Sequence, residues 1–294
     1  MLRRVIQPRW RIGIVENSLE GIVNGEELRV QWPANPFHDR WFADPFVLSV
    51  DGDEVTLLVE DYRYKDGKGR ISRIIVDMER NSIVSCKTIL DGGHYSFPAI
   101  MRYEGKVYFY PEQSRQGKLE LFEYCPKTET CEYVETISDE PLTDAIIYKG
   151  VVFSTRLPEP NGKTLKMFKW PSAVQEFKHE TRNSALGSAA FEVVTEKELE
   201  TRNSKLETFS FSECIARNAG DFFECGGKVY RPAQECNRWY GNALSIQLYK
   251  NGEFKEVRRI PRMHTLNSYQ GVTVVDRKIF PFKWVYRLLR KSDK

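Results

Sequence analysis

Acidic residues stand at corresponding places in several short segments of this chain. Asp44 and Asp144 each lie just before an apolar run, and Glu112 and Glu235 each end a segment that contains Val, Tyr and Pro. Cleavage of a glycosidic bond takes two carboxyl groups, one protonated to release the leaving oxygen and one ionised to activate water or attack the sugar. The sequence therefore offers Asp44 and Asp144 as a candidate catalytic pair, with Glu112 or Glu235 as a third carboxyl group.

Each of these carboxyl groups also has a structural interpretation. An Asp-Pro dipeptide, as at Asp44, is common in turns and at strand entries. Glu112 and Glu235 could form salt bridges with neighbouring arginines. Two further acidic candidates, Glu60 and Asp221, could instead be a solvated strand end and a turn residue.

Other polar and aromatic residues near the same segments suit a sugar or a phosphate group. A guanidinium presents a planar fork to an anion, and Asn and Gln match the donor and acceptor pattern of a diol. Aromatic faces can stack on pyranose rings, although aromatic residues in a β-protein also fill its core. The candidate ligand-binding residues are Arg217, Asn218, Asp221, Arg231, Gln234, His264, Trp41, Tyr95 and Tyr240. This chemistry predicts a carbohydrate or a sugar phosphate as the partner.

The sequence lacks the spacing that metal ligands usually show. Its histidines form neither an HxxxH nor an HExxH pattern, and its six cysteines contain no CxxC pair. A lone histidine is more often a hydrogen-bonded structural residue than a metal ligand. We therefore expect no obligatory metal and no cofactor.

The candidate residues belong to a recurring unit of two short strands joined by a Gly-bearing turn. Residues 42–61 and 95–112 are examples, and further units begin near residues 143, 216 and 264. Segments between them, such as 71–76 and 243–249, have the composition of additional strands. Roughly four strands in each of about five units, spaced by about 50 residues, predict an all-β, five-bladed β-propeller with about four antiparallel strands per blade.

The whole chain, residues 1–294, is expected to form this one domain. Two β-sandwiches would need a boundary between them, and no linker rich in Pro, Gly and Ser marks one. The polar and charged region of residues 172–205 breaks the rhythm of the units. It predicts an irregular insertion between the third and fourth blades, either with a short helix near residues 195–200 or as a long hairpin over one face.

Composition narrows the classes of partner and location. With 44 Lys and Arg against 41 Asp and Glu, the net charge of +3 lacks the basic excess of a nucleic-acid-binding domain. We find no apolar run of about 18 residues for a transmembrane segment and no secretory signal. Scattered cysteines indicate reduced thiols and a cytoplasmic location. The basic, aromatic segment from Phe280 could contact a membrane surface peripherally or close the last blade.

Two sets of motifs resemble known propellers. Ala43-Asp-Pro-Phe46 and Thr143-Asp-Ala-Ile-Ile147 look like the lead-in strands of five-bladed propellers of the glycoside hydrolase family 43 and 32 type. A closer resemblance, over about residues 10–283, is to the N-terminal propeller domain of glucosamine inositolphosphorylceramide transferases. It rests on the motifs Ser96-Phe-Pro with Tyr110-Pro-Glu112, Ala216-Arg-Asn-Ala-Gly220, and Tyr230-Arg-Pro-Ala-Gln234 with Tyr240-Gly241. Bacterial relatives of that domain occur near polysaccharide biosynthesis functions.

The resemblance to family 43 implies roles for two of the carboxyl groups. Asp44 corresponds by position to the general base, and Asp144 to the residue that tunes pKa values and orients. The Glu that opens the fourth blade of that family as general acid has no match, because the chain has Arg217-Asn218 there, followed by Asp221. The resemblance thus implies the fold more fully than the reaction.

Two functions follow from these observations. The first is a carbohydrate-active, glycoside hydrolase-like propeller that binds a sugar in a central pocket lined by carboxylates and could cleave or transfer a glycosyl unit. The alternative is a non-catalytic module that binds a glycan or sugar phosphate in polysaccharide or glycolipid biosynthesis. Both predict that residues at equivalent positions of the units lie near one end of a shared axis, namely Asp44, Ser96, Asp144, Arg217 and His264.

Overall fold

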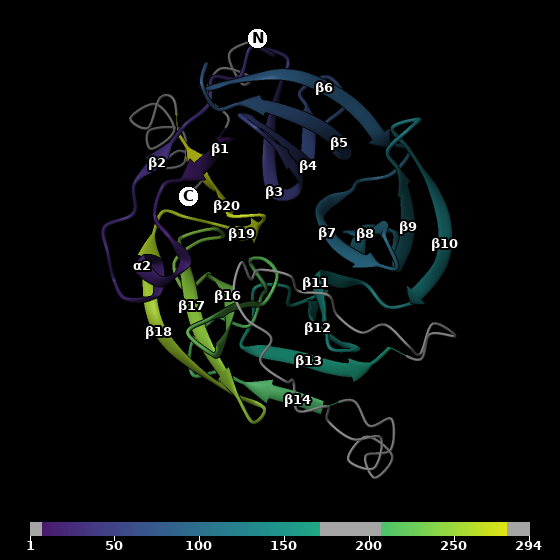
Figure 1. Ribbon diagram of the computed structural model, residues 1–294. Helices are drawn as coiled ribbons and strands as arrows, with labels where there is room; N and C mark the ends of the chain where they lie inside the picture. The colour runs from purple at the N-terminus through teal and green to yellow at the C-terminus, as the bar shows by residue number, and fades with distance from the viewer. Residues whose placement is uncertain (1–7, 171–206, 281–294) are drawn as a thin grey trace, which may run out of the picture.

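The computed structural model describes residues 8–170 and 207–280. Its 20 strands form five four-stranded antiparallel sheets arranged as a ring around one axis, so the predicted five-bladed propeller is confirmed (Figure 1). The expected insertion at 172–205 and the C-terminal segment beyond Phe280 lie outside the described residues. In the described part of the chain, no helix is long and apolar enough to cross a bilayer.

Each blade runs from an inner strand at the axis to an outer strand at the rim (Figure 1). Blade 1 comprises β3 (Arg40–Asp51), β4 (Glu54–Arg63), β5 (Lys68–Asp77) and β6 (Ser82–Leu90). Blade 2 comprises β7 (Ser96–Tyr103), β8 (Lys106–Glu112), β9 (Leu119–Cys125) and β10 (Thr130–Ser138), with a short 3-10 helix, η1 (Ser114–Gln116), between β8 and β9. Blade 3 comprises β11 (Leu142–Tyr148), β12 (Val151–Arg156), β13 (Thr164–Lys169) and β14 (Glu207–Ser210).

The last two blades complete the ring. Blade 4 comprises β15 (Phe223–Cys225), β16 (Lys228–Glu235), β17 (Ala243–Lys250) and β18 (Glu253–Pro261). Blade 5 comprises β19 (Leu266–Tyr269), β20 (Val272–Ile279), β1 (Arg9–Val15) and β2 (Val30–Gln31). A helix of five residues, α2 (Leu19–Val23), connects β1 to β2 and begins at Ser18, whose hydroxyl accepts a hydrogen bond from the Gly21 amide at 3.1 Å.

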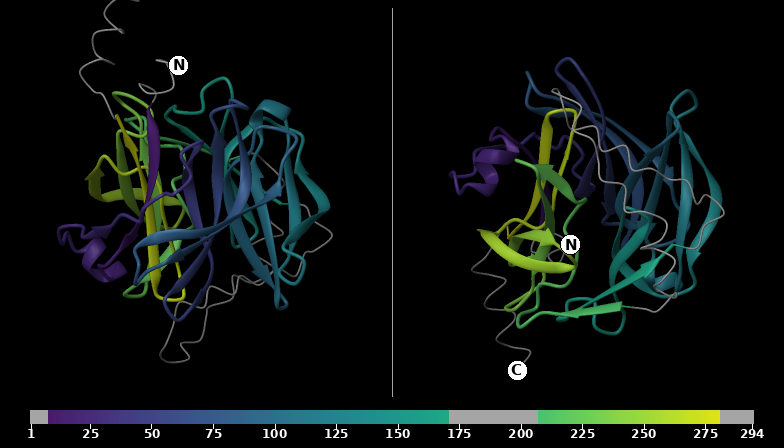
Figure 2. Two further views of the ribbon diagram at one scale, coloured as in Figure 1. Left: turned by 90° about the horizontal axis from the view of Figure 1, so that it is seen from above. Right: turned by 60° about the horizontal axis from the view of Figure 1, so that its bottom comes forward.

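Blade 5 is built from both ends of the described chain. Strand β1 pairs with β20 along its whole length, from Arg9 opposite Ile279 to Val15 opposite Thr273. Figure 2 shows the purple β1 beside the yellow β20. Hydrogen bonds between the two ends therefore close the ring.

Packing between the blades explains the strand sequences. The middle of β4 is apolar at successive positions, Leu57, Leu58 and Val59, and all three side chains are fully buried. Alternation is weak there because both faces of the strand contact protein, one in each of two buried clusters. The outer strand β18 instead alternates between exposed and partly buried residues, since only one face is covered.

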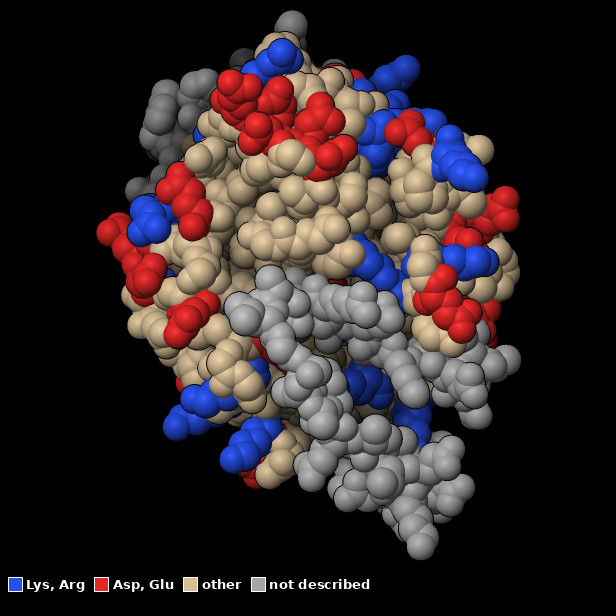
Figure 3. Space-filling view, in the orientation of Figure 1, with Lys and Arg blue, Asp and Glu red and all other residues tan. Residues whose placement is uncertain are grey.

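Charge on the surface is mixed. Lys and Arg side chains are interspersed with Asp and Glu over the face seen in Figure 3, and acidic side chains gather over blade 1 at the top of that view. All six cysteines are free thiols. The mixture of acidic and basic side chains on the surface agrees with the small net charge of +3.

The inner strands of three blades carry the same irregularity. A register shift separates Ala43 from Phe46 in β3, Ser96 from Ala99 in β7, and Thr143 from Ile146 in β11. The first bulged residue of each has a positive φ although it is not glycine: 49° at Asp44, 44° at Phe97 and 44° at Asp144. Such bulges bend a strand and redirect side chains, and they cluster near functional sites.

Candidate functional site

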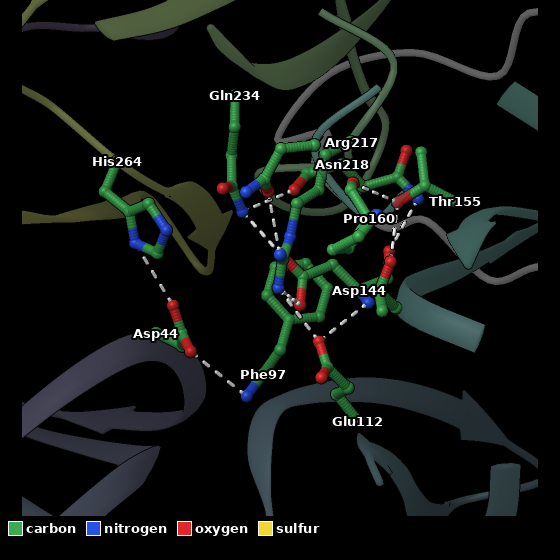
Figure 4. Close-up of polar contacts among 12 residues, drawn as sticks. Asp44, Phe97, Glu112, Asp144, Thr155, Pro160, Arg217, Asn218, Gln234 and His264 are labelled. Carbon is green, nitrogen blue, oxygen red and sulfur yellow. Dashed lines mark hydrogen bonds and ion pairs between the residues drawn. The ribbon is translucent and has the colours of Figure 1, made fainter. Parts of the chain in front are cut away.

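The second strand of every blade places one polar residue at the same end of the axis. Each of these residues lies opposite a residue in the first part of the inner strand or in the segment before it: Glu60 opposite Ala43, Glu112 opposite Ser96, Thr155 opposite Thr143, Gln234 opposite Arg217, and Asp276 opposite His264. The five predicted axial residues meet at this end: Figure 4 shows Asp44, Asp144, Arg217 and His264, and Ser96 lines the same space as Arg217 and His264. The predicted convergence is therefore confirmed.

Carboxylates at this end join blade 5 to blade 1, blade 1 to blade 2, and blade 2 to blade 3. Asp276 Oδ2 accepts a hydrogen bond from the Asp44 amide at 3.0 Å, and Asp44 Oδ2 accepts one from the Phe97 amide at 3.2 Å. Glu112 Oε2 likewise accepts from the Asp144 amide at 3.3 Å. The three amides are those of the bulged residues with positive φ, so side chains from neighbouring blades hold the bulges in place.

Arg217 is the centre of an ionic network among blades 2, 3 and 4. Its Nε lies 2.6 Å from Asp144 Oδ2, and its Nη2 lies 3.1 Å from Asp144 Oδ1 and 3.0 Å from Glu112 Oε2 (Figure 4). Nη1 donates to Asn161 Oδ1 at 3.0 Å, and the guanidinium stands 4.9 Å from the centroid of the Tyr240 ring. Every nitrogen of the Arg217 fork is engaged, so this residue is not free to receive a phosphate group.

The two carboxyl groups beside Arg217 titrate in opposite directions. Burial, followed by repulsion from Asp144, raises the pKa of Glu112 to about 8. Burial would also raise the pKa of Asp144, but attraction to Arg217, hydrogen bonds with Glu112 and Arg217 and attraction to His264 together outweigh it and lower that pKa below its ordinary value. Glu112 therefore holds a proton at neutral pH while Asp144 is ionised.

His264 lies between two carboxylates. Its Nδ1 is 3.3 Å from Asp44 Oδ1 and 3.2 Å from Asp276 Oδ2. Burial lowers the pKa of His264, but Asp276 and Asp44 together raise it to about 10, so the ring is an imidazolium at neutral pH. Burial raises the pKa of Asp44 in spite of this partner.

The same three residues, Asp44, His264 and Asp276, form a group whose ligand atoms all lie within 4.8 Å of one another among the described residues. They could in principle hold a metal ion, because carboxylate oxygen and imidazole nitrogen are common ligands. A metal needs the imidazole without its proton, whereas the two carboxylates retain that proton. The geometry is that of a charge-paired histidine, and the expectation of no obligatory metal stays a prediction.

A cavity of about 380 Å³ opens beside this network. Its size lies in the range of small-molecule sites. Five of the predicted site residues line it: Trp41, Glu112, Arg217, Tyr240 and His264. Its aromatic walls include Trp41 stacked on Tyr62, with ring centroids 4.5 Å apart, and Trp10 packed on His264 at 4.3 Å.

The remaining predicted residues do not line the cavity. Asp44 and Asp144, the leading catalytic candidates, are buried behind it in the contacts described above. Tyr95 is also absent from the lining, and Glu235 accepts hydrogen bonds from the Asn237 amide at 2.7 Å and from the Asn242 side chain. The catalytic roles assigned to these carboxyl groups therefore stay predictions.

Three of the predicted ligand-binding residues form a buried support under the network. Asn218 donates to the carbonyl oxygens of Asp144 at 2.6 Å and Phe153 at 2.8 Å, and it accepts from Arg231 Nε at 2.8 Å. Gln234 donates to Asp144 Oδ2 at 2.6 Å. Arg231 is fully buried, and burial lowers its pKa to about 9. These side chains order the site without facing its ligand.

Asp221 occupies another place, next to blade 5. Its amide donates to Asn267 Oδ1 at 2.9 Å, and Asn267 in turn donates to the Pro45 carbonyl oxygen at 2.9 Å. Burial raises the pKa of Asp221 to about 7, although Arg102 opposes the shift. Asp221 is thus a junction between blades rather than a residue of the cavity.

Glu60 is the cavity residue that sequence reasoning undervalued. It is 7% exposed rather than a solvated strand end, it lines the cavity, and its pKa is raised well above the ordinary value by burial and then by Asp44 and Glu112. Gly69 makes room for it, because a Cβ there would overlap Glu60 Oε1 and approach the Tyr95 carbonyl oxygen. Equivalence with Glu112 across the repeats is the signal that could have identified Glu60.

His94 supplies a donor of fixed tautomer to the same cavity. Its Nδ1 accepts a hydrogen bond from the Gly69 amide at 2.9 Å, so the proton of the neutral ring is on Nε2. Burial, then Arg115, lowers the pKa of His94 to about 4. The ring is neutral at pH 7 and offers an N–H group to a ligand.

The family model for the N-terminal region of glucosamine inositolphosphorylceramide transferase 1 matches residues 31–273. The chain belongs to this family. A glucosamine inositolphosphorylceramide transferase 1 of Oryza sativa subsp. japonica is 27% identical over 266 residues, which cover 82% of this chain and 32% of the relative. The protein of the same name from Arabidopsis thaliana is 24% identical over 228 residues, covering 74% and 27%. The chain thus spans about a third of the length of the curated relatives it matches.

Among solved structures, the chain is similar to propellers of glycoside hydrolases. The catalytic domain of a GH62 α-L-arabinofuranosidase from Coprinopsis cinerea matches with a TM-score of 0.49 and 7% identity, over 84% of this chain and 96% of that one. A GH43B protein of Bacteroides ovatus matches with a TM-score of 0.42 and 13% identity, over 73% and 42%. Similarity at this level says nothing about the site.

Proposed function

We propose that this chain binds a sugar in the cavity at the end of its axis. The observation that carries this proposal is the composition of the cavity wall. The carboxyl groups of Glu60 and Glu112, whose pKa values are both raised, and the neutral ring of His94 lie around a space bounded by the stacked Trp41 and Tyr62. Neutral donors and acceptors beside aromatic faces match the alternating hydroxyl and C–H surfaces of a pyranose.

The two arginines predicted to bind the ligand favour an uncharged sugar over a phosphate beside them, although the exposed Arg115 also lines the cavity. Arg217 is occupied by Asp144, Glu112 and Asn161, and Arg231 is buried below the network in hydrogen bonds with Asn218 and Gln247. Neither arginine offers a free fork to an anion. The proposal therefore favours the sugar over the sugar phosphate among the predicted partners.

Binding is favoured over catalysis by the place of the ionised groups. Hydrolysis needs an ionised carboxylate at the sugar as well as a protonated one. Asp144 is ionised but is held by Arg217 and Gln234 outside the cavity lining. The relatives are named glucosamine inositolphosphorylceramide transferase 1, and this chain covers about a third of their length. We infer an accessory, glycan-recognising propeller of glycolipid or polysaccharide synthesis.

Calorimetric titration with glucosamine, N-acetylglucosamine and a panel of other monosaccharides tests this function. Trp41→Ala removes an aromatic wall of the cavity and is expected to weaken the affinity for a sugar by about tenfold, corresponding to about 1.4 kcal/mol. Trp239→Ala is the matched control, because that ring is 53% exposed and lies outside the cavity. Equal losses in the two variants, or no sugar bound by the unaltered chain, would contradict the proposal.

Glycosyl cleavage or transfer is a second candidate, and the raised pKa values of the two carboxyl groups in the cavity favour it. Glu60 or Glu112 could release a leaving oxygen as general acid, with Asp44 as the base. Asp44→Asn would then reduce turnover of a responsive glycoside by about 10²–10⁴-fold, while sugar affinity changes far less. Absence of turnover by the unaltered chain over a broad glycoside panel, with sugar binding retained, leaves the binding function alone.

A further inference from the structure

Three arginines gather in blade 5, outside the sugar cavity. Arg11 of β1 and Arg277 of β20 stand directly opposite each other in the register of this strand pair. Arg262, which is exposed, lies close enough to repel Arg277. Like charges directly opposite each other on antiparallel strands destabilise the pairing. A negatively charged group beside these guanidinium groups would therefore relieve the repulsion between them.

That group is not a neighbouring carboxylate of the described chain. None of the ion pairs found within residues 8–170 and 207–280 includes Arg11, Arg262 or Arg277. The carboxylate of the adjacent Asp276 accepts from Thr265 and faces His264 instead. Burial lowers the pKa of Arg277, and repulsion from Arg11 and Arg262 lowers it further.

Trp32 orders the two opposed guanidinium groups. Arg277 Cζ lies 3.8 Å from the centroid of the Trp32 ring, and Arg11 Cζ lies 5.8 Å from it. Arg11 Nη2 also donates to the Trp32 carbonyl oxygen at 2.6 Å. Gly13 allows this packing, because a Cβ there would overlap Val30 and meet the Trp32 ring at 3.0 Å.

The guanidinium of Arg277, which stacks on Trp32, has a hydrogen-bond donor without a partner among the described residues. Its Nε is buried and has no hydrogen-bond partner in the described part of the chain. A buried donor without a partner is unfavourable. The face of the guanidinium contacts Trp32, so its edge, where the N–H groups lie, is the part left for a ligand.

We propose that Arg11, Arg277 and Trp32 form a binding site for a phosphate group, with Arg262 at its edge. A guanidinium fork bonds two phosphate oxygens at once, and stacking on an aromatic face fixes its orientation. The site is separate from the sugar cavity, whose lining contains none of these four residues. A soluble phosphate ester and a phospholipid headgroup present the same oxygens, so either can supply the group.

Thermal unfolding with increasing inorganic phosphate, at constant ionic strength kept with sodium chloride, tests the site. A ligand that binds the folded protein raises its melting temperature by mass action. We expect phosphate to raise it in the unaltered chain and in Arg80→Gln, a control that loses the same charge from a side chain 76% exposed in blade 1. Arg277→Gln and Arg11→Gln should each weaken the apparent affinity by at least about tenfold.

A vesicle arm identifies the source of the phosphate. Cosedimentation with phosphatidylcholine vesicles containing phosphatidic acid, lost in Arg277→Gln and displaced by inorganic phosphate, indicates a lipid headgroup. Binding of glucose 1-phosphate without vesicle binding indicates a soluble ester. If Arg277→Gln does not fold, Arg277→Lys, which keeps the charge and loses the fork, takes its place with Arg11→Gln. The proposal would be overturned if the unaltered chain bound neither inorganic phosphate, glucose 1-phosphate nor the vesicles. It would also be overturned if phosphate raised the melting temperatures of Arg277→Gln and Arg80→Gln equally.

Discussion

Replacing Glu112 by glutamine should change how the stability of the propeller depends on pH. The pKa of Glu112 rises from 4.5 to about 8 in the folded protein, through burial and then the neighbouring Asp144. Between these values the folded chain holds a proton that the unfolded chain releases. Stability therefore falls as pH rises from about 4.5 to about 8, by at most about 5 kcal/mol if the whole shift acts on folding.

The amide in Glu112→Gln keeps the shape of the protonated carboxyl group and cannot ionise. The variant is expected to unfold like the unaltered chain near pH 5 and to become relatively more stable, by a few kcal/mol, near pH 8. Urea denaturation followed by circular dichroism at a series of pH values measures this difference. Glu132→Gln is the control, because that side chain is exposed on β10.

Other groups cannot imitate this result. His264, whose pKa is raised to about 10, and Asp221, whose pKa is raised to about 7, also lower stability as pH rises, but they contribute equally to both proteins. Subtracting the two stability curves isolates Glu112 together with the changes that its replacement causes in the pKa values of Glu60 and Asp144. A difference that stays constant from pH 5 to pH 8 would refute the assignment of a retained proton to Glu112.

Three further outcomes are expected. Gly69→Ala places a Cβ on Glu60 Oε1 and should weaken sugar binding, measured by calorimetry, by about tenfold or more. Gly162→Ala, whose Cβ meets nothing closer than 3.2 Å, should leave sugar binding unchanged. Asn218→Ala removes the hydrogen-bond partner of two carbonyl oxygens and of Arg231 Nε, and it should lower the free energy of unfolding, measured in urea, by about 2–4 kcal/mol. A loss below about 0.5 kcal/mol would contradict the supporting role of Asn218. A reductant should leave the melting temperature unchanged because all six cysteines are free. A clear fall in the melting temperature, corresponding to the loss of the about 2–4 kcal/mol that a disulfide contributes to stability, would also count against the cytoplasmic location we propose.

The sequence was sufficient for the blades because their signal is local. Each hairpin is indicated by apolar strands on either side of a turn. In the turn at Lys149-Gly150, both residues have the positive φ that a tight hairpin turn requires. Repetition of that unit then predicts the ring. The convergence of Asp44, Asp144 and Arg217 follows from equivalent positions in the repeat.

The side chains that face the ligand could not be read in the same way. A bulge at Asp44 or Asp144 shifts the strand by one residue, and nothing in the local residue types distinguishes it from a regular strand. The bulged carboxylates consequently bind amides and Arg217, while Glu60 and Glu112 on the second strands line the cavity. Long-range pairing determines which side chains line the cavity, and it also leaves Arg231 without a carboxylate partner among the described residues.

Closure of the ring by β1 matters for anyone who isolates this domain from a longer relative. The family match begins at residue 31 and ends at residue 273, so it omits β1 and most of β20. A fragment cut at these limits would leave blade 5 without the strand that contributes the buried Ile12 and Ile14, and would expose the edge of β19. An open sheet edge invites pairing with other chains. Expression boundaries placed outside the positions of Arg9 and Ile279 keep the two ends of the ring together.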